Sequence, residues 1–204
     1  AFVLKPKTII MKKLIAILII ITSQSIFSQN EKKFSAFFGA TVPTFTQGMA
    51  EDFNGFTVTP HFGAFYEQKL TNKIHFRPTI LYVQQGNNQM PVGYNSTYQL
   101  GYQNYRLNYL QIPLNFKFWN KTYALFGPQV GFLISSKSNG YNTDKPKSSV
   151  DYGINAAFGQ RIKNFYIELG AYQGLKPVIE SYDFGKKIDL NNAYGRLSLG
   201  WYFY

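Results

Sequence analysis

The sequence predicts an all-β fold, in which an eight-stranded antiparallel up-and-down β-barrel crosses a membrane and follows an N-terminal signal peptide. Three observations lead to this prediction. Apolar and polar residues alternate along successive segments, as they do in strands with two different faces. Short turns and long polar loops alternate between those segments, as they do in membrane barrels. Aromatic residues make up 18% of the 204 residues and charged residues only 15%, against about 25% charged in an ordinary soluble domain.

Composition also excludes several classes of protein. The abundance of aromatic residues argues against a disordered chain, and the absence of cysteine excludes disulfide scaffolds, thiolate metal sites and lipid anchors attached through cysteine. A formal net charge of +11 would suggest an anionic partner, but four of the basic residues lie within residues 1–28. The others are spread over turns, loops and strands without a patch, so we expect no nucleic-acid partner.

Residues 11–28 have the layout of a secretory signal peptide. A basic start at 11–13 is followed by an apolar run at 14–21 and by a polar stretch that ends in small residues. The run is shorter than the ~20 residues that a membrane-spanning helix needs, which leaves an anchor or a buried helix as the weaker alternative. With cleavage after Ser28, the predicted division is an upstream or non-native extension at 1–10, the signal peptide at 11–28 and the outer-membrane barrel at 29–204.

Eight segments of the remaining chain are predicted to be strands. The first three, at 34–42, 57–68 and 74–85, are β-like in composition but irregular in their alternation. The fourth, at 110–118, is the clearest, because every even position is large and apolar and every odd position is polar or Pro, as expected for a strand with one apolar and one polar face. The same alternation recurs in four further segments, at 124–134, 151–161, 165–172 and 196–203.

Short and long connections alternate between the predicted strands. Tight turns at 70–73, 120–121 and 163–164 have the composition of hairpin turns. Long polar stretches lie between them, at about 43–56, 86–104, 136–149 and 176–191. In outer-membrane barrels the short turns are periplasmic and the long loops extracellular. We therefore expect a protein of the bacterial outer membrane, with both termini in the periplasm and the long loops outside the cell.

The composition of the polar face indicates which side of the sheet is buried. A soluble lipocalin-like barrel, the alternative fold, also has eight strands but buries its apolar face. Here the polar face carries Gly, Tyr, Asn, Gln and Ser rather than dense Lys and Glu, which suits the crowded lumen of a small barrel. Aromatic residues beside the short turns fit an interfacial girdle, namely Phe118, Trp119, Tyr123, Phe165, Tyr166 and residues 201–204.

Four motifs, taken in their order along the chain, resemble one known family. They are Tyr109-Leu110-Gln111-Ile112-Pro113-Leu114, Phe126 to Ser135, Asp151-Tyr152-Gly153-Ile154 and Leu197 to Phe203. This order resembles the PorT-like outer-membrane β-barrel family of Bacteroidetes, whose members commonly have Glu where this chain has Gln111. The resemblance implies the barrel fold and the outer-membrane location. Because the namesake is associated with secretion through the type IX system, it also implies a link with protein secretion.

The last predicted strand ends in aromatic residues. This end resembles the C-terminal signal by which the barrel assembly machinery recognises outer-membrane barrels, with Trp201, Phe203 and Tyr204 as the residues that would carry the signal. An ordinary edge strand that ends in Tyr is the alternative. We therefore expect two partners from the fold itself, the assembly machinery and the outer-membrane lipid.

The sequence offers little catalytic chemistry. His61 and His75 are its only histidines, and an outer-membrane enzyme that modifies lipid would need a base at the outer leaflet. His75 follows a short turn, which places it at the opposite end, and no carboxylate is placed by the sequence to orient His61. Neither histidine has a partner at metal-ligand spacing. We expect no catalytic residue, no metal site and no cofactor, with a lipid-modifying enzyme as the weakest alternative.

Charged residues on the polar faces of the strands are predicted to form a network in the lumen. They are Lys117, Asp151, Arg161, Glu168 and Arg196. Buried charges must be paired, and three basic residues with two acidic ones could form such a network. A pore-lining set is the alternative, although eight strands leave little open channel.

The expected function depends on the loops. Tyrosines among Asn, Gly and Ser suit adaptable recognition surfaces, and the candidates are Tyr94, Tyr98, Tyr102 and Tyr141. Loops that are only hydrophilic caps are the alternative. We expect a non-enzymatic outer-membrane protein with a structural or partner-binding role in the cell envelope, of which an accessory role in protein secretion is one form. The alternative function is a narrow channel for small solutes.

Overall fold

The computed structural model describes the barrel strands and the three turns that join them at one end. The described residues are 32–47, 51–53, 57–86, 90–92, 101–103, 105–138, 141–142, 147–183 and 186–203. The expected extension at 1–10 and signal peptide at 11–28 lie outside the described residues, and so do Tyr94, Tyr98 and Tyr204. Within the described residues, no helix has the length and apolar character needed to cross a membrane.

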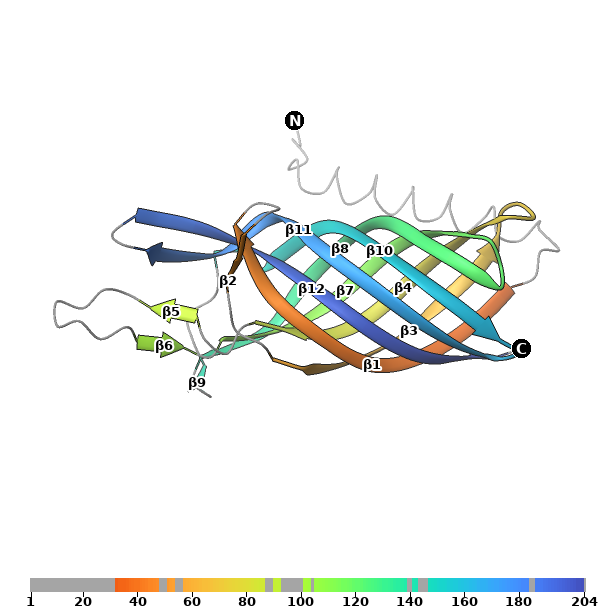
Figure 1. Cartoon of the computed structure of the whole chain (residues 1–204), viewed down its shortest axis with the longest axis horizontal. Helices are drawn as coiled ribbons and strands as arrows, with labels where there is room; N and C mark the ends of the chain where they lie inside the picture. The colour runs from red at the N-terminus through yellow and green to blue at the C-terminus, as the bar shows by residue number, and fades with distance from the viewer. Residues whose placement is uncertain are drawn as a thin grey trace, which may run out of the picture. The chain divides into compact units, whose positions relative to one another are not determined.

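Eight long strands pair side by side, each antiparallel to the next, and close into a barrel (Figure 1). Phe34 on the first strand pairs with Phe203 on the last, which seals the sheet. Closure pairs the backbone N–H and C=O groups that hydrocarbon cannot hydrogen-bond. The predicted eight-stranded antiparallel barrel is confirmed. In chain order its strands are β1 (Lys32–Gln47), β3 (Thr59–Lys69), β4 (Ile74–Gln85), β7 (Tyr105–Phe118), β8 (Thr122–Ser138), β10 (Val150–Ile162), β11 (Phe165–Asp183) and β12 (Lys186–Phe203).

The two ends of the barrel differ, and we call them the turn end and the loop end. The turn end holds the three tight turns, the start of β1 and the last residues of β12. In the first turn, Thr71 Oγ1 accepts hydrogen bonds from the backbone N–H groups of Lys73 and Ile74, at 3.3 and 3.0 Å. Short strands lie at the loop end. There β2 (Glu51–Phe53) pairs with β1, β9 (Tyr141–Asn142) pairs with β8, and β5 (Met90–Val92) pairs with β6 (Gly101–Gln103).

At the loop end, the barrel strands continue further than the sequence predicts. The assignment of 176–191 to a long polar loop is wrong, because β11 and β12 run through most of it. The ladder shifts register on both sides of Pro177, whose nitrogen has no hydrogen to donate. Beyond this irregularity Val178 is fully buried, a position that the polar composition of the stretch does not reveal. The starts of 43–56 and 136–149 also belong to strands.

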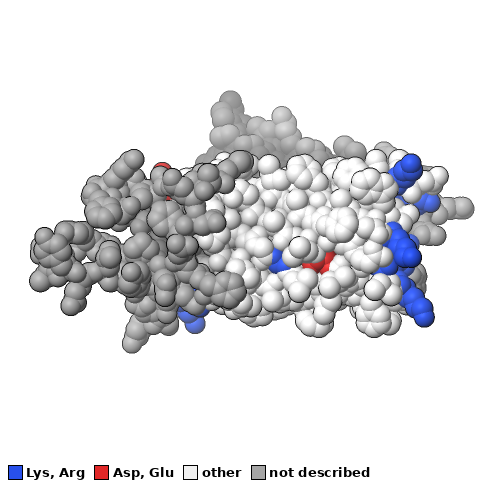
Figure 2. Space-filling model, in the orientation of Figure 1, with Lys and Arg blue, Asp and Glu red and all other residues white. Residues whose placement is uncertain are grey.

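The apolar face of each strand lies on the outside of the barrel. Phe38 is 66% exposed and Leu169 is 65% exposed, whereas Gln111 and Lys117 on the polar face are fully buried. Figure 2 shows a barrel wall made mostly of uncharged residues. This arrangement suits lipid outside and a polar lumen, and it is the inverse of the lipocalin-like alternative.

Basic side chains gather at the turn end, where Figure 2 shows Lys and Arg as a blue group. Each tight turn supplies one exposed lysine, and these are Lys73, Lys121 and Lys163. They are far apart in the sequence, but an up-and-down barrel brings every second connection to the same end. The expectation that the basic residues form no patch is therefore wrong at this end.

The aromatic residues beside the turns divide between the two faces of the sheet. Trp119 and Phe165 are more than half exposed on the outside. Tyr123, Tyr166 and Tyr202 are at most 2% exposed and lie in the lumen, because strand alternation gives them the same face as the polar residues. The assignment of these tyrosines to an interfacial girdle is therefore wrong for Tyr123, Tyr166 and Tyr202.

Glycines on the inward face make room for these rings. Tyr123 pairs with Gly159 on the neighbouring strand, and Tyr166 pairs with Gly200. A Cβ at either glycine would lie 2.3 Å from the facing tyrosine, which is far inside contact distance. In a barrel of eight strands, a ring laid over glycine can enter the lumen without pushing the strands apart.

Gly159→Ala is expected to lower the free energy of unfolding by about 1–3 kcal/mol, because the new methyl group displaces the buried Tyr123 ring. The matched control is Gly195→Ala. A Cβ there would meet no atom within 4 Å, so stability should change by less than about 0.5 kcal/mol. Urea unfolding of both variants in the same detergent measures the difference, and equal effects would contradict the packing argument.

Candidate functional site

The candidate site is the barrel lumen, in which polar side chains from opposite strands meet in successive layers. In the layer nearest the turn end, Lys117 of β7 donates from Nζ to both carboxylate oxygens of Glu67 on β3, at 2.9 and 3.0 Å. The same ammonium lies 3.2 Å from the hydroxyl of Tyr202 on β12, which donates to Glu67 at 3.1 Å. Because β7 and β12 lie on opposite sides of the barrel, these three side chains bridge its diameter.

The second layer centres on Glu168 of β11. Its carboxylate forms ion pairs with Arg77 of β4 at 2.9 Å and with Arg196 of β12 at 3.0 Å, and it accepts a hydrogen bond from the Tyr123 hydroxyl at 3.3 Å. The Arg77 guanidinium lies 3.5 Å from the centre of the Phe65 ring, a cation–π contact that favours a desolvated charge. Since β4 and β11 also lie on opposite sides, one carboxylate holds a guanidinium group across the lumen.

The third layer, nearer the loop end, is built mainly from neutral groups. The Tyr194 hydroxyl of β12 donates to Gln111 of β7 at 2.8 Å and accepts from Gln129 at 3.1 Å. Near them, Asn192 donates to the Asp151 carboxylate at 2.9 Å. Further toward the loop end, buried polar side chains such as Thr59 and Gln85 are joined by apolar ones. Four of these are fully buried, namely Phe45, Leu107, Val178 and Leu190.

These layers bury the charged side chains of the lumen. In the part of the chain that the structure describes, the buried charged residues number three of each sign, and all are at most 4% exposed. Glu67 pairs with Lys117, and Glu168 pairs with Arg77 and Arg196, so five of these six buried charges have a partner of opposite sign. The arrangement can therefore brace the wall. The six residues are Arg77, Lys117, Arg196, Glu67, Asp151 and Glu168.

Of the five lumen charges predicted from the sequence, the structure buries four. Glu168 and Arg196 form an ion pair with each other, whereas Lys117 and Asp151 bind other partners. The fifth, Arg161, lies at the turn end and is partly exposed. Its guanidinium lies 4.6 Å from the centre of an inward tyrosine ring.

Sequence reasoning missed two members of the network, Glu67 and Arg77. Both lie in segments whose alternation is irregular. In β4 a signal was nevertheless present, because His75, Arg77 and Thr79 occupy alternate positions and all three are buried. In β3 the inward face also carries the apolar Phe65, which hides the distinction between the two faces.

His61 is a bridge inside the wall. Its Nδ1 lies 2.8 Å from Thr41 Oγ1 on β1, and its Nε2 lies 2.8 Å from Ser198 Oγ on β12. The residue is 1% exposed, so lipid at the outer surface does not reach the ring. Among the described residues, no group of three or more His, Cys, Asp or Glu side chains is arranged to hold a metal ion. The geometry gives the lipid-modifying alternative no support.

The remaining candidate residues are placed only in part. Trp201 is 36% exposed and Phe203 52% exposed on the outer face. Tyr102 lies in β6 and Tyr141 in β9, both at the loop end. The roles of these residues in assembly and in recognition stay predictions.

One known protein family matches this chain. A family model described as outer membrane protein beta-barrel domain matches residues 27–180. The chain belongs to this family. It is therefore an outer-membrane β-barrel protein, and its location is the bacterial outer membrane. A comparison with curated proteins gives no match.

Solved structures of outer-membrane barrels resemble this one. Neisserial surface protein A is 9% identical with a TM-score of 0.54, and the match covers 83% of this chain and 97% of that one. Ail of Yersinia pestis is 16% identical, with a TM-score of 0.43 and coverage of 85% and 99%. OprG of Pseudomonas aeruginosa is 10% identical, with a TM-score of 0.45 and coverage of 86% and 97%. At such identities, the likeness to the Neisserial protein concerns the fold alone.

Removing Lys117 tests the buried network of this outer-membrane barrel. Lys117→Met would leave the Glu67 carboxylate buried without its cation, so the free energy of unfolding should fall by about 3–5 kcal/mol. The matched control is Lys147→Met, which breaks an ion pair with Asp189 whose side chains are 40% and 45% exposed. That loss should not exceed about 1 kcal/mol. Urea unfolding followed by tryptophan fluorescence measures both.

A double variant separates the energy of the Lys117–Glu67 pair from the cost of leaving one of its charges unpaired. Glu67→Gln combined with Lys117→Met removes both charges and should recover most of the lost stability, because no uncompensated charge stays buried. If Lys117→Met costs no more than Lys147→Met, or if the double variant recovers nothing, the pair does not hold the lumen together.

Proposed function

We propose that this outer-membrane barrel is a sealed, non-enzymatic protein with a structural or partner-binding role in the cell envelope. The observation that carries the proposal is the pair of bridges across the lumen, one from Lys117 to Tyr202 and one from Arg77 to Glu168. A conducting pore needs a continuous path of water, and two bridges at different depths interrupt it. What remains available for function is the surface of the barrel and its loop end.

The proposal includes an orientation. The turn end would face the periplasm and the loop end the outside of the cell, as is usual for outer-membrane barrels. The short strands β2, β5, β6 and β9 all belong to the loop end (Figure 1), so structured segments extend there beyond the eight-stranded wall. A protein partner would bind at this end, near Tyr102 and Tyr141.

A link with protein secretion is the finer form of the proposal. Its support is the order of the four motifs that resemble the PorT-like family. At the position where members of that family commonly have Glu, Gln111 accepts a hydrogen bond from Tyr194. A glutamate there would add a fourth buried acid to a lumen with three charges of each sign. Gln111 makes this contact without adding a charge to the lumen.

Planar-bilayer recordings test the sealed lumen. The purified barrel is expected to give no ion-current steps, because side chains span its diameter in two layers. A porin reconstituted in the same membrane is the positive control. Reproducible steps from the wild-type barrel would contradict the proposal and favour the narrow channel for small solutes.

Photo-crosslinking in cells tests the partner-binding role. A photoreactive amino acid at Tyr102 or Tyr141 is expected to give a discrete protein adduct, because the loop end would carry the partner. The matched control is the same amino acid at Phe126, which is 55% exposed on the barrel wall and should react with lipid. No adduct from the loop end, or the same adduct from Phe126, would count against a partner bound there.

A further inference from the structure

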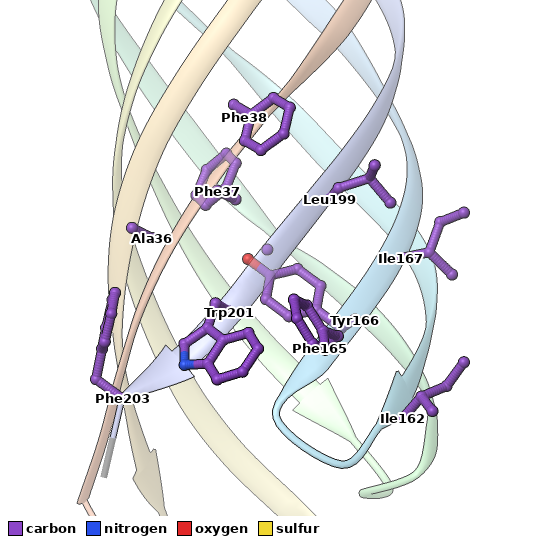
Figure 3. Close-up of a pocket in the computed structure, with 11 residues that line it drawn as sticks. Ala36, Phe37, Phe38, Ile162, Phe165, Tyr166, Ile167, Leu199, Trp201 and Phe203 are labelled. Carbon is purple, nitrogen blue, oxygen red and sulfur yellow. The ribbon is translucent and has the colours of Figure 1, made fainter.

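A groove runs along the outer wall at the turn end, beside the seam where β12 meets β1 (Figure 3). It has a volume of about 620 Å³ and is formed by β1, β11 and β12, together with Ile162 at the end of β10. Along β12 it extends from Phe203 to Leu199, which is about 13 Å of extended strand. Its lining is almost entirely apolar and includes Phe38, Phe165, Ile167, Leu199, Trp201 and Phe203.

Ala36 explains why the wall is hollowed here. The outward positions of β1 run Phe34, Ala36 and Phe38, so a single methyl group stands between two rings. On the neighbouring strand β3, Ala36 faces another small residue, Ala64. A second apolar groove, of about 460 Å³, lies on that side. The two grooves have the shape and chemistry that hydrocarbon chains fill.

One basic side chain borders the first groove. Lys163 lies in the turn between Ile162 and Phe165, both of which line the groove, and it is exposed. Lys73 and Lys121 are exposed at the other two turns of the same end. The acidic side chains nearest this end, in the part of the chain that the structure describes, are buried in the lumen. The rim of the groove is therefore cationic.

We propose that the turn end binds an anionic phospholipid of the surrounding leaflet, with one acyl chain in the groove and the phosphate at Lys163. The acyl chain determines the position of the lipid but gives little preference for one phospholipid over another, because every phospholipid has acyl chains. Charge supplies the preference, at about fivefold for each lysine that meets the anionic headgroup. The proposal depends on the barrel spanning a membrane and is independent of the partner-binding role proposed above.

The same charges disfavour other apolar occupants of the groove. A second copy of the chain would bring its own lysine rim to the same level, and like charges repel. The apolar run at 14–21 follows Lys12 and Lys13, so this segment also carries positive charge. An anionic lipid combines the hydrocarbon with the complementary sign.

Trp201 lines the groove and can report its occupant. The chain has two tryptophans, so Trp119→Phe leaves Trp201 as the reporter. The converse variant, Trp201→Phe, leaves Trp119, which lies between β7 and β8 on the opposite side of the barrel. Each protein is reconstituted in phosphatidylcholine vesicles with a small fraction of phosphatidylglycerol brominated on its acyl chains, or with the same fraction of brominated phosphatidylcholine. Heat-modifiable migration confirms that each variant is folded.

Brominated phosphatidylglycerol is expected to quench Trp201 on the order of fivefold more effectively than brominated phosphatidylcholine, with a smaller preference at Trp119. Lys163→Gln should reduce the preference at Trp201 to about one, because it removes the charge at the groove. Lys147→Gln, at an exposed lysine of the loop end, should leave it unchanged. Ala36→Phe, which fills the groove, should reduce quenching of Trp201 by both lipids.

Three results would overturn the proposal. Equal quenching of Trp201 by the two lipids would show that the groove does not select charge. An equal preference at both tryptophans would show diffuse attraction to the lysines without a seated chain. If neither lipid quenched Trp201 while both quenched Trp119, protein would cover the groove, either as a second copy or as a segment of the same chain.

Discussion

Backbone hydrogen bonding in hydrocarbon is the constraint on which this structure depends. A strand in lipid cannot leave N–H or C=O groups unpaired, so the sheet closes with β1 against β12. Eight strands enclose a lumen that side chains just fill, and a charge buried there is costly unless it has a partner. The three buried charges of each sign and the glycines beneath Tyr123 and Tyr166 follow from these requirements.

The outer wall could be predicted from the sequence because lipid acts on each residue independently. In 110–118, every even position is apolar, and the structure turns those positions outward. The partners in the lumen could not be predicted in the same way. Lys117 binds Glu67, which lies 50 residues earlier, and that choice depends on strand register and barrel diameter. Alternation alone would have placed Tyr123 inside, since it shares a face with Gln129.

The turn end carries a second arrangement that the linear sequence does not reveal. Lys73, Lys121 and Lys163 are isolated in the sequence, and each taken alone is an ordinary solvent-exposed residue of a turn. The up-and-down connection brings them to one rim above an apolar wall. A surface with a lipid-like pattern of charge and hydrocarbon therefore arises from three residues that no local motif connects. Because the lumen is filled, surfaces of this kind carry the contacts open to the protein.

Every layer of the lumen includes a residue of β12. Tyr202 meets a glutamate 135 residues earlier, Tyr194 meets Gln111 across 83 residues, and Arg196 pairs with Glu168 in the layer between them. Before β12 has paired with the sheet, the partners of these three residues would lack some of their hydrogen bonds and ion pairs. Contacts between such distant residues form late and slow folding. Pairing of the 18-residue strand β12 therefore completes the polar contacts of the lumen and stabilises the barrel. A barrel truncated before β12 would have unmatched polar groups at every depth.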